Sequence, residues 1–129
     1  MDNGLSPRGR TVMIVDDEFF FRQLLRDIVE KHGLTVIAEA SDGPGAVENY
    51  MKHRPDLTLM DIFMPDGNGI EATREIVGRD SAARVLICSG VGYDDDIDAA
   101  LAAGAKDIIY KPFLPEEVIA CIRKVLGSV

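Results

Sequence analysis

Several features that would assign a chain to a membrane or to an oxidising compartment are missing from this sequence. Its two cysteines, Cys88 and Cys121, both stand among apolar neighbours, which indicates buried, reduced thiols in a cytosolic protein. No apolar run approaches the roughly 20 residues that a membrane span needs. Residues 1–10 lack the apolar core of a signal peptide and predict a short flexible tail. The expected location is the cytoplasm, without membrane insertion.

Basic residues are also scarce. The chain has 14 Lys and Arg against 22 Asp and Glu, a net charge of -8. This balance argues against binding to nucleic acid or to an anionic membrane, because both require a basic patch. The 129 residues, of which 47% are hydrophobic, suffice for one core and show no internal repeat. We therefore expect one domain, covering residues 11–129.

What the sequence does contain is a regular alternation of short apolar strands with amphipathic helices. Phe20, Leu24 and Leu25 begin the apolar face of the first helix, and Gly33 suits its C-terminal end. The predicted strands cover residues 12–16, 35–38, 56–61, 84–89 and 106–110, and the predicted helices cover residues 20–32, 41–54, 69–78, 94–104 and 115–127.

Five strands, each followed by a helix, predict an α/β fold with a parallel sheet covered on both faces. The expected architecture is flavodoxin-like, a doubly wound (βα)5 sheet with right-handed crossovers and the strand order 2-1-3-4-5. In such sheets ligands bind beyond the carboxyl ends of the strands, at the switch point between strands 1 and 3.

Polar side chains occupy those carboxyl ends. Asp16 and Asp17 follow the first strand, Asp61 ends the third, Ser89 ends the fourth and Lys111 follows the fifth. Three carboxylates in one pocket would raise their own pKa values or destabilise the fold. A divalent cation resolves this conflict, and a site of oxygen ligands suits Mg²⁺ or Mn²⁺ rather than zinc.

Lys111 and Ser89 indicate the purpose of such a metal, since a cation, an ammonium and a hydroxyl together bind phosphoryl oxygens. No Ser-His-Asp or Cys-His pair offers a nucleophile, because His32 and His53 lie at helix ends away from this edge. A carboxylate can itself attack phosphorus and form an acyl phosphate. Asp61, on the central strand, is the candidate nucleophile.

With these residues in view, the segments VDDE, LMDIFMPDGNGIE, ICSG and AKDIIYKPF resemble the receiver domain of bacterial two-component response regulators, over about residues 11–126. The resemblance implies that Asp61 accepts a phosphoryl group from a phosphohistidine of a sensor histidine kinase or phosphotransfer protein. It further implies that Asp17, Asp61 and the backbone carbonyl of Phe63 bind Mg²⁺ directly, while Asp16 reaches the metal through water.

The same resemblance assigns the phosphoryl contacts. Ser89 and Lys111 would touch the phosphoryl oxygens, together with the backbone N–H groups of Phe63 and Gly90. The Lys111–Pro112 peptide would be cis and would aim the lysine.

Such a domain works as a switch in which the Ser89 hydroxyl moves toward the phosphoryl group. Related domains carry Tyr or Phe three residues before the lysine, where this chain has Ile108. We expect Ile108 to be a half-buried aliphatic side chain. Tyr110 lies on the same strand face; core packing is the favoured role for it, and a part in the switch is the alternative.

We expect the signal to pass to a partner protein, because no second domain follows in this sequence. The expected docking surface is formed by the fourth helix, the fifth strand and the last helix. Residues 87–113 are similar to stand-alone chemotaxis regulators of the CheY type, which would imply a chemotaxis kinase upstream. A phosphorelay intermediate, or a domain excised from a longer regulator, is the alternative.

We expect no enzyme activity beyond self-phosphotransfer and autodephosphorylation. A flavodoxin-like electron carrier would share the sheet, but the acids at 16–18 would repel the phosphate of FMN. A Mg²⁺-dependent phosphohydrolase would usually carry a further acid two residues after its nucleophile, where this chain has Phe63, and a cap over its substrate.

Overall fold

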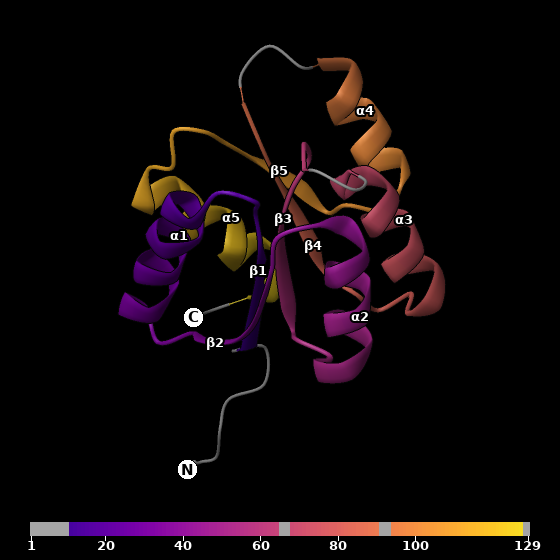
Figure 1. Ribbon diagram of the computed structural model, residues 1–129. Coiled ribbons are helices and arrows are strands. Elements are labelled where there is room, and N and C mark those ends of the chain that lie inside the picture. The colour runs from indigo at the N-terminus through magenta and orange to yellow at the C-terminus, as the bar shows by residue number, and fades with distance from the viewer. Residues whose placement is uncertain (1–10, 65–67, 91–93, 128–129) are drawn as a thin grey trace.

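The strands form one parallel sheet in the order β2-β1-β3-β4-β5, as the sequence predicts (Figure 1). The structure, a computed structural model, describes residues 11–64, 68–90 and 94–127, so the predicted tail at 1–10 lies outside the described residues. The strands are β1 (Thr11–Val15), β2 (Thr35–Ala40), β3 (Leu57–Asp61), β4 (Val85–Ser89) and β5 (Asp107–Tyr110).

Helices cover both faces of the sheet, α1 and α5 on one and α2, α3 and α4 on the other (Figure 1). Among the described residues no helix is long and apolar enough to cross a membrane. The helices are α1 (Phe19–Lys31), α2 (Gly43–His53), α3 (Gly69–Arg79), α4 (Asp94–Ala102) and α5 (Pro115–Leu126).

Alternation along the strands divides the core into two layers. Val12 and Ile14 of β1 face α1 and α5, whereas Met13 and Val15 face the opposite helices. Because both faces are covered, the central strands are buried at nearly every position. Cys88 and Cys121 are free thiols buried in the α1–α5 layer, as expected.

Strand β2 is longer than the sequence predicts. It continues to Ala40, two residues beyond the predicted end, where the Asp16 amide donates to the Ala40 carbonyl (3.1 Å). Glu39 interrupts the apolar pattern there, but Arg22 and Arg26 of α1 pair with its carboxylate. A charged residue can therefore occupy the strand.

The expected apolar face of α1 is wrong at its first position. Phe20 is 69% exposed, and Phe21 packs instead against the core. Phe21 lies four residues before Leu25, so it satisfies the same helical spacing. Its ring also meets that of Phe113, edge to face, at 5.6 Å between centroids.

Local signals fix several helix ends. The Asp42 side chain accepts a hydrogen bond from the Gly45 amide (2.7 Å) at the start of α2, and Asn68 accepts one from the Glu71 amide (2.9 Å) at the start of α3. Gly33 has φ of 85° and ends α1, as predicted.

Gly69 joins the start of α3 to the strand that carries Asp61. Its amide donates to the Ile62 carbonyl at 2.7 Å. A Cβ atom at this position would lie 1.9 Å from the Asp61 carbonyl oxygen, so no side chain fits here without moving the backbone.

This close approach predicts that Gly69→Ala lowers the free energy of unfolding by about 1–3 kcal/mol, because the added methyl group must displace backbone. Gly78→Ala, in the exposed part of the same helix, is the matched control, since nothing lies within 4 Å of its added Cβ. We expect that control to gain about 0.5–1 kcal/mol. Urea unfolding measures both, and a Gly69→Ala protein of native stability would contradict the packing described.

Candidate functional site

The carboxyl ends of the strands bring the predicted site residues to one edge of the sheet. Asp16 directly follows β1, Asp61 ends β3 and Ser89 ends β4. The register places Asp61 beside Cys88 and Ser89 beside Tyr110, so the strands end at the same level. Lys111 then follows β5 and reaches across this edge.

Lys111 connects two buried acids. Its Nζ lies 3.3 Å from Asp16 Oδ2 and 3.4 Å from Asp61 Oδ1. The Asp16 and Asp61 side chains are only 1% and 8% exposed, and that of Lys111 is 17% exposed. Buried carboxylates need a compensating charge, and in this structure the ammonium supplies it.

The electrostatic compensation of Asp61 is incomplete. Burial raises its pKa to about 6, the negative charge of Asp16 adds to the effect, and Lys111 only partly opposes it. Burial alone would lower the pKa of Lys111, but Asp61 and Asp16 outweigh it and raise that pKa above its ordinary value. Asp61 Oδ1 also accepts a hydrogen bond from the Ile62 amide (3.0 Å).

Asp16 offers an oxygen suited to a metal ion. Its Oδ1 accepts from the Glu18 amide (2.9 Å), whereas its Oδ2 is buried and accepts no hydrogen bond within the described part of the chain. Carboxylate oxygens of Asp16, Asp17 and Glu18 lie within 4.8 Å of one another. A group of carboxylate oxygens in which Asp16 Oδ2 has only the ion pair with Lys111 fits a hard divalent cation such as Mg²⁺.

The acids of this group differ from the predicted carboxylates in two ways. Asp61 is not among them, and it lies with Asp16 against Lys111 instead. Glu18 is among them, although the carboxylate ligands predicted from the sequence are only Asp16, Asp17 and Asp61. The run of three acids after the first strand was the signal that could have included it.

Ser89 is turned toward its own loop. It is 1% exposed, and its Oγ donates to the Gly90 carbonyl at 3.0 Å. Its own carbonyl accepts from the Lys111 amide at 2.8 Å, which ties the ends of β4 and β5 together. The Lys111–Pro112 peptide is cis, as the resemblance implies.

The two residues considered for the switch lie in different environments. Ile108 is half-buried against the α2–α3–α4 layer, as expected. Tyr110 is 44% exposed, so the favoured expectation of core packing is wrong. Strand β5 is the edge of the sheet, and a side chain at its carboxyl end has fewer neighbours to cover it.

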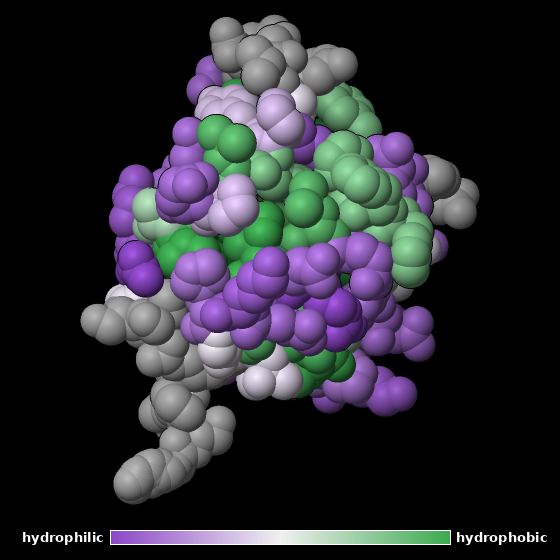
Figure 2. All heavy atoms as spheres, turned by 90° about the vertical axis from the view of Figure 1, so that its left-hand side faces the viewer, coloured by the Kyte–Doolittle hydropathy of each residue, from purple (hydrophilic) through white to green (hydrophobic). Residues whose placement is uncertain are grey.

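Apolar side chains surround this edge of the molecule. Figure 2 shows apolar surface gathered on the face of α1 and α5. Phe19 and Phe20 at the start of α1 are 65% and 69% exposed, Leu114 before α5 is 48% exposed, and Phe63 beside the Asp61 loop is 51% exposed. Because Phe19 and Phe20 adjoin each other at the start of α1, this face is a candidate protein-binding surface.

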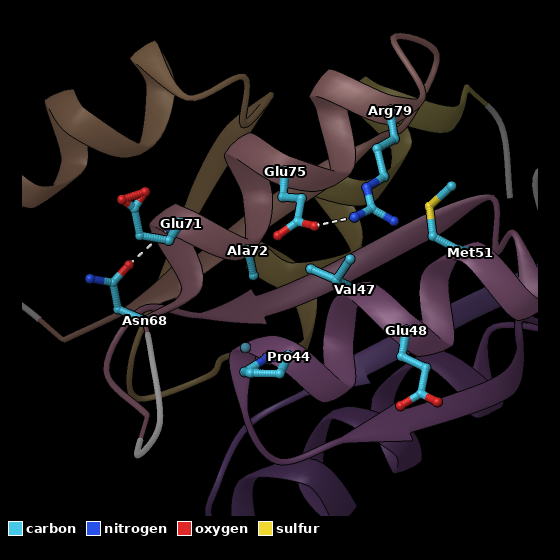
Figure 3. A pocket seen from close by; sticks show the side chains of 10 residues that line it. Pro44, Val47, Glu48, Met51, Asn68, Glu71, Ala72, Glu75 and Arg79 are labelled. Carbon is cyan, nitrogen blue, oxygen red and sulfur yellow. Dashed lines mark hydrogen bonds and ion pairs between the residues drawn. The ribbon is translucent and has the colours of Figure 1, made fainter.

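A separate hollow lies between α2 and α3, with a volume of about 590 Å³ (Figure 3). Val47 and Met51 of α2 and Ala72 of α3 form apolar parts of its wall, and Glu75 and Arg79 pair with each other along α3 at its rim. None of the predicted site residues lines it, so this hollow does not belong to the carboxylate site.

The geometry and the fold define a class of protein. The profile of the response regulator receiver domain matches residues 12–123, so the chain belongs to the family of response regulator receiver domains, the phosphoacceptor proteins of two-component signalling.

Several of its relatives are chemotaxis proteins. The chain is 45% identical to the chemotaxis protein CheY of Thermotoga maritima, an alignment that covers 91% of this chain and 98% of that protein. It is 46% identical to CheY of Bacillus subtilis, covering 90% and 97%. A CheX–CheY–BeF3–Mg²⁺ complex from Borrelia burgdorferi superposes with a TM-score of 0.87 at 33% identity, covering 92% of this chain and 90% of the matched one.

The buried charge of Asp61 predicts a pH-dependent stability in metal-free protein. Its folded pKa of about 6 lies above the ordinary value of 3.8, so the folded state holds the proton more tightly than the unfolded state. Stability therefore falls as the pH rises from about 4 through about 6. In EDTA, Asp61→Asn should be more stable than the native chain by about 1–3 kcal/mol at pH 8.

The difference should vanish below about pH 4, where the native carboxyl is protonated in both states. Urea unfolding at several pH values measures it. An equal gain for Asp61→Asn at acidic and alkaline pH would show that burial of the charge is not the cause.

Proposed function

We propose that this chain is a switch in which Asp61 accepts a phosphoryl group from a phosphohistidine of a sensor histidine kinase or a phosphotransfer protein. An Asp61 carboxylate oxygen attacks phosphorus, and the P–N bond of the donor breaks. The imidazole nitrogen keeps the electron pair and takes a proton from water. The observation that carries the proposal is the buried Asp61–Lys111–Asp16 arrangement at the carboxyl edge of the sheet.

Mg²⁺ fits this site, with Mn²⁺ as a substitute. Asp16, Asp17, Asp61 and the backbone carbonyl of Phe63 would hold it, and the oxygens of Glu18 lie close enough to contribute. When bound, the ion neutralises charge on phosphoryl oxygens. The under-coordinated Asp16 Oδ2 supports this assignment, and the Borrelia burgdorferi complex contains CheY with BeF3 and Mg²⁺.

Lys111, Ser89 and the backbone amides of Phe63 and Gly90 would contact the phosphoryl oxygens of phosphorylated Asp61. Lys111 already lies 3.4 Å from Asp61 Oδ1. Ser89 Oγ now donates to the Gly90 carbonyl, so its hydroxyl has to turn away from the backbone to reach the new oxygens. That rotation is the local event of the switch.

The pathway we infer is chemotaxis, because the relatives at 45% and 46% identity are CheY proteins. A chemotaxis kinase would act upstream. The apolar surface of the α1–α5 face, which includes the exposed Phe19 and Phe20, supports docking of a protein phospho-donor there (Figure 2). A role as phosphorelay intermediate remains the second candidate.

The downstream target would bind the face of α4, β5 and α5, where Leu101 and Tyr110 are each 44% exposed. The net charge of -8 argues against nucleic acid as the target. We propose a cytoplasmic protein whose own chemistry is limited to self-phosphotransfer and autodephosphorylation.

The test is intact-protein mass after incubation with acetyl phosphate, with and without Mg²⁺, for the native chain and Asp61→Asn. We expect a labile phosphoryl adduct on the native chain that requires Mg²⁺ and is absent from Asp61→Asn. No adduct under any condition, or an equal adduct on the variant, would overturn the proposal.

Phe63 gives a prediction about the lifetime of the phosphorylated state. We expect the Phe63 ring, two residues after Asp61 in the chain, to exclude water from the acyl phosphate, so Phe63→Asn should shorten its half-life several-fold. Leu101→Asn, an equally drastic change at an exposed apolar residue of α4, should leave the half-life unchanged. Loss of the phosphoryl adduct over time measures both variants, and an unchanged half-life in Phe63→Asn would rule out the shielding role.

A further inference from the structure

Phe21 makes a contact with Lys111 that the proposed chemistry has not yet used. The Lys111 Nζ lies 4.1 Å from the centroid of the Phe21 ring, well inside the range of about 6 Å for a cation–π interaction. Phe113 lies edge to face with Phe21, and its own centroid is 6.0 Å from the same nitrogen. The ammonium therefore has an aromatic neighbour besides the two carboxylates.

The carboxylates alone hold Lys111 loosely. Its distances of 3.3 Å to Asp16 and 3.4 Å to Asp61 exceed the roughly 2.7–2.9 Å of a strong charge-assisted hydrogen bond. The lysine side chain is only 17% exposed, so water competes weakly for the ammonium. Under these conditions the attraction to the ring face is strengthened, because desolvated cation–π contacts are the stronger ones.

We propose that Phe21 is a positioning residue for Lys111, which its ring face holds beside Asp61 during phosphoryl transfer. The inference rests on the function proposed above and names a further residue of that same site. An uncharged ring has a specific advantage over an acid in this position. It attracts the ammonium without adding negative charge that would repel an incoming phosphoryl group.

A purely structural role for Phe21 makes different predictions. If the ring only fills space in the α1–α5 layer, leucine should replace it with little effect on the reaction. If the ring face holds the ammonium, leucine should fail and tyrosine should succeed, because tyrosine keeps the π system.

The first experiment compares the rate of phosphorylation by acetyl phosphate in saturating Mg²⁺ for Phe21→Leu, Phe21→Tyr and Leu24→Val. Leu24 is the matched control, because it packs from the same helix against the same α1–α5 layer as Phe21. We expect Phe21→Leu to lower the maximal rate about fivefold with a small change in the half-saturating donor concentration. Phe21→Tyr and Leu24→Val should stay within about twofold of the native rate. A native rate in Phe21→Leu, or an equal loss in Phe21→Tyr, would overturn the inference.

The second experiment does not depend on phosphorylation. In metal-free protein labelled at lysine, the NMR signals of the Lys111 side chain should be shifted upfield by the Phe21 ring current relative to exposed Lys52. The shift should disappear in Phe21→Leu and persist in Phe21→Tyr. An unshifted Lys111 in the native chain would overturn the inference even where phosphorylation proceeds, whereas a shifted Lys111 in a chain that forms no adduct would overturn the proposed function instead.

Discussion

The structure of this site depends on one ammonium group that lies against two buried carboxylates. Asp16 and Asp61 end neighbouring strands of a sheet covered on both faces, so neither can be hydrated freely. Lys111 compensates them from β5, on the far side of β4. The strand order and the common level of the strand ends together bring these three side chains into one site.

Lys111 compensates only part of the negative charge of the two buried carboxyl groups. Asp61 keeps a pKa of about 6, and Asp16 Oδ2 accepts no hydrogen bond from the described residues. A purely structural ion pair would be expected to satisfy both partners, whereas a site prepared for a cation and a phosphoryl group retains unsatisfied charge until they bind. Local electrostatic strain at the carboxyl edge is thus consistent with a receiver domain.

Much of this arrangement was predictable because apolar runs and turn residues act locally. The strand order followed from five βα units, and the candidate residues followed from what stands at each strand end. The errors arose from tertiary contacts. Glu39 extends β2 only because two arginines of α1 reach it. Phe21 rather than Phe20 faces the core, since both positions fit a helical spacing and only packing against Phe113 distinguishes them. Tyr110 is exposed because β5 is an edge strand.

The environments of Ile108 and Tyr110 constrain how this chain can transmit its signal. The aliphatic side chain of Ile108 is already half-buried, so it cannot supply an aromatic ring that swings inward, whereas Tyr110 is exposed and starts from the outward position that such a movement requires. Ser89 pairs with Tyr110 in the ladder, and its carbonyl accepts from the Lys111 amide at 2.8 Å. We therefore expect a displacement of Ser89 to act through this backbone hydrogen bond on the end of β5, which would couple the proposed phosphoryl site to Tyr110 and to the proposed α4–β5–α5 docking face.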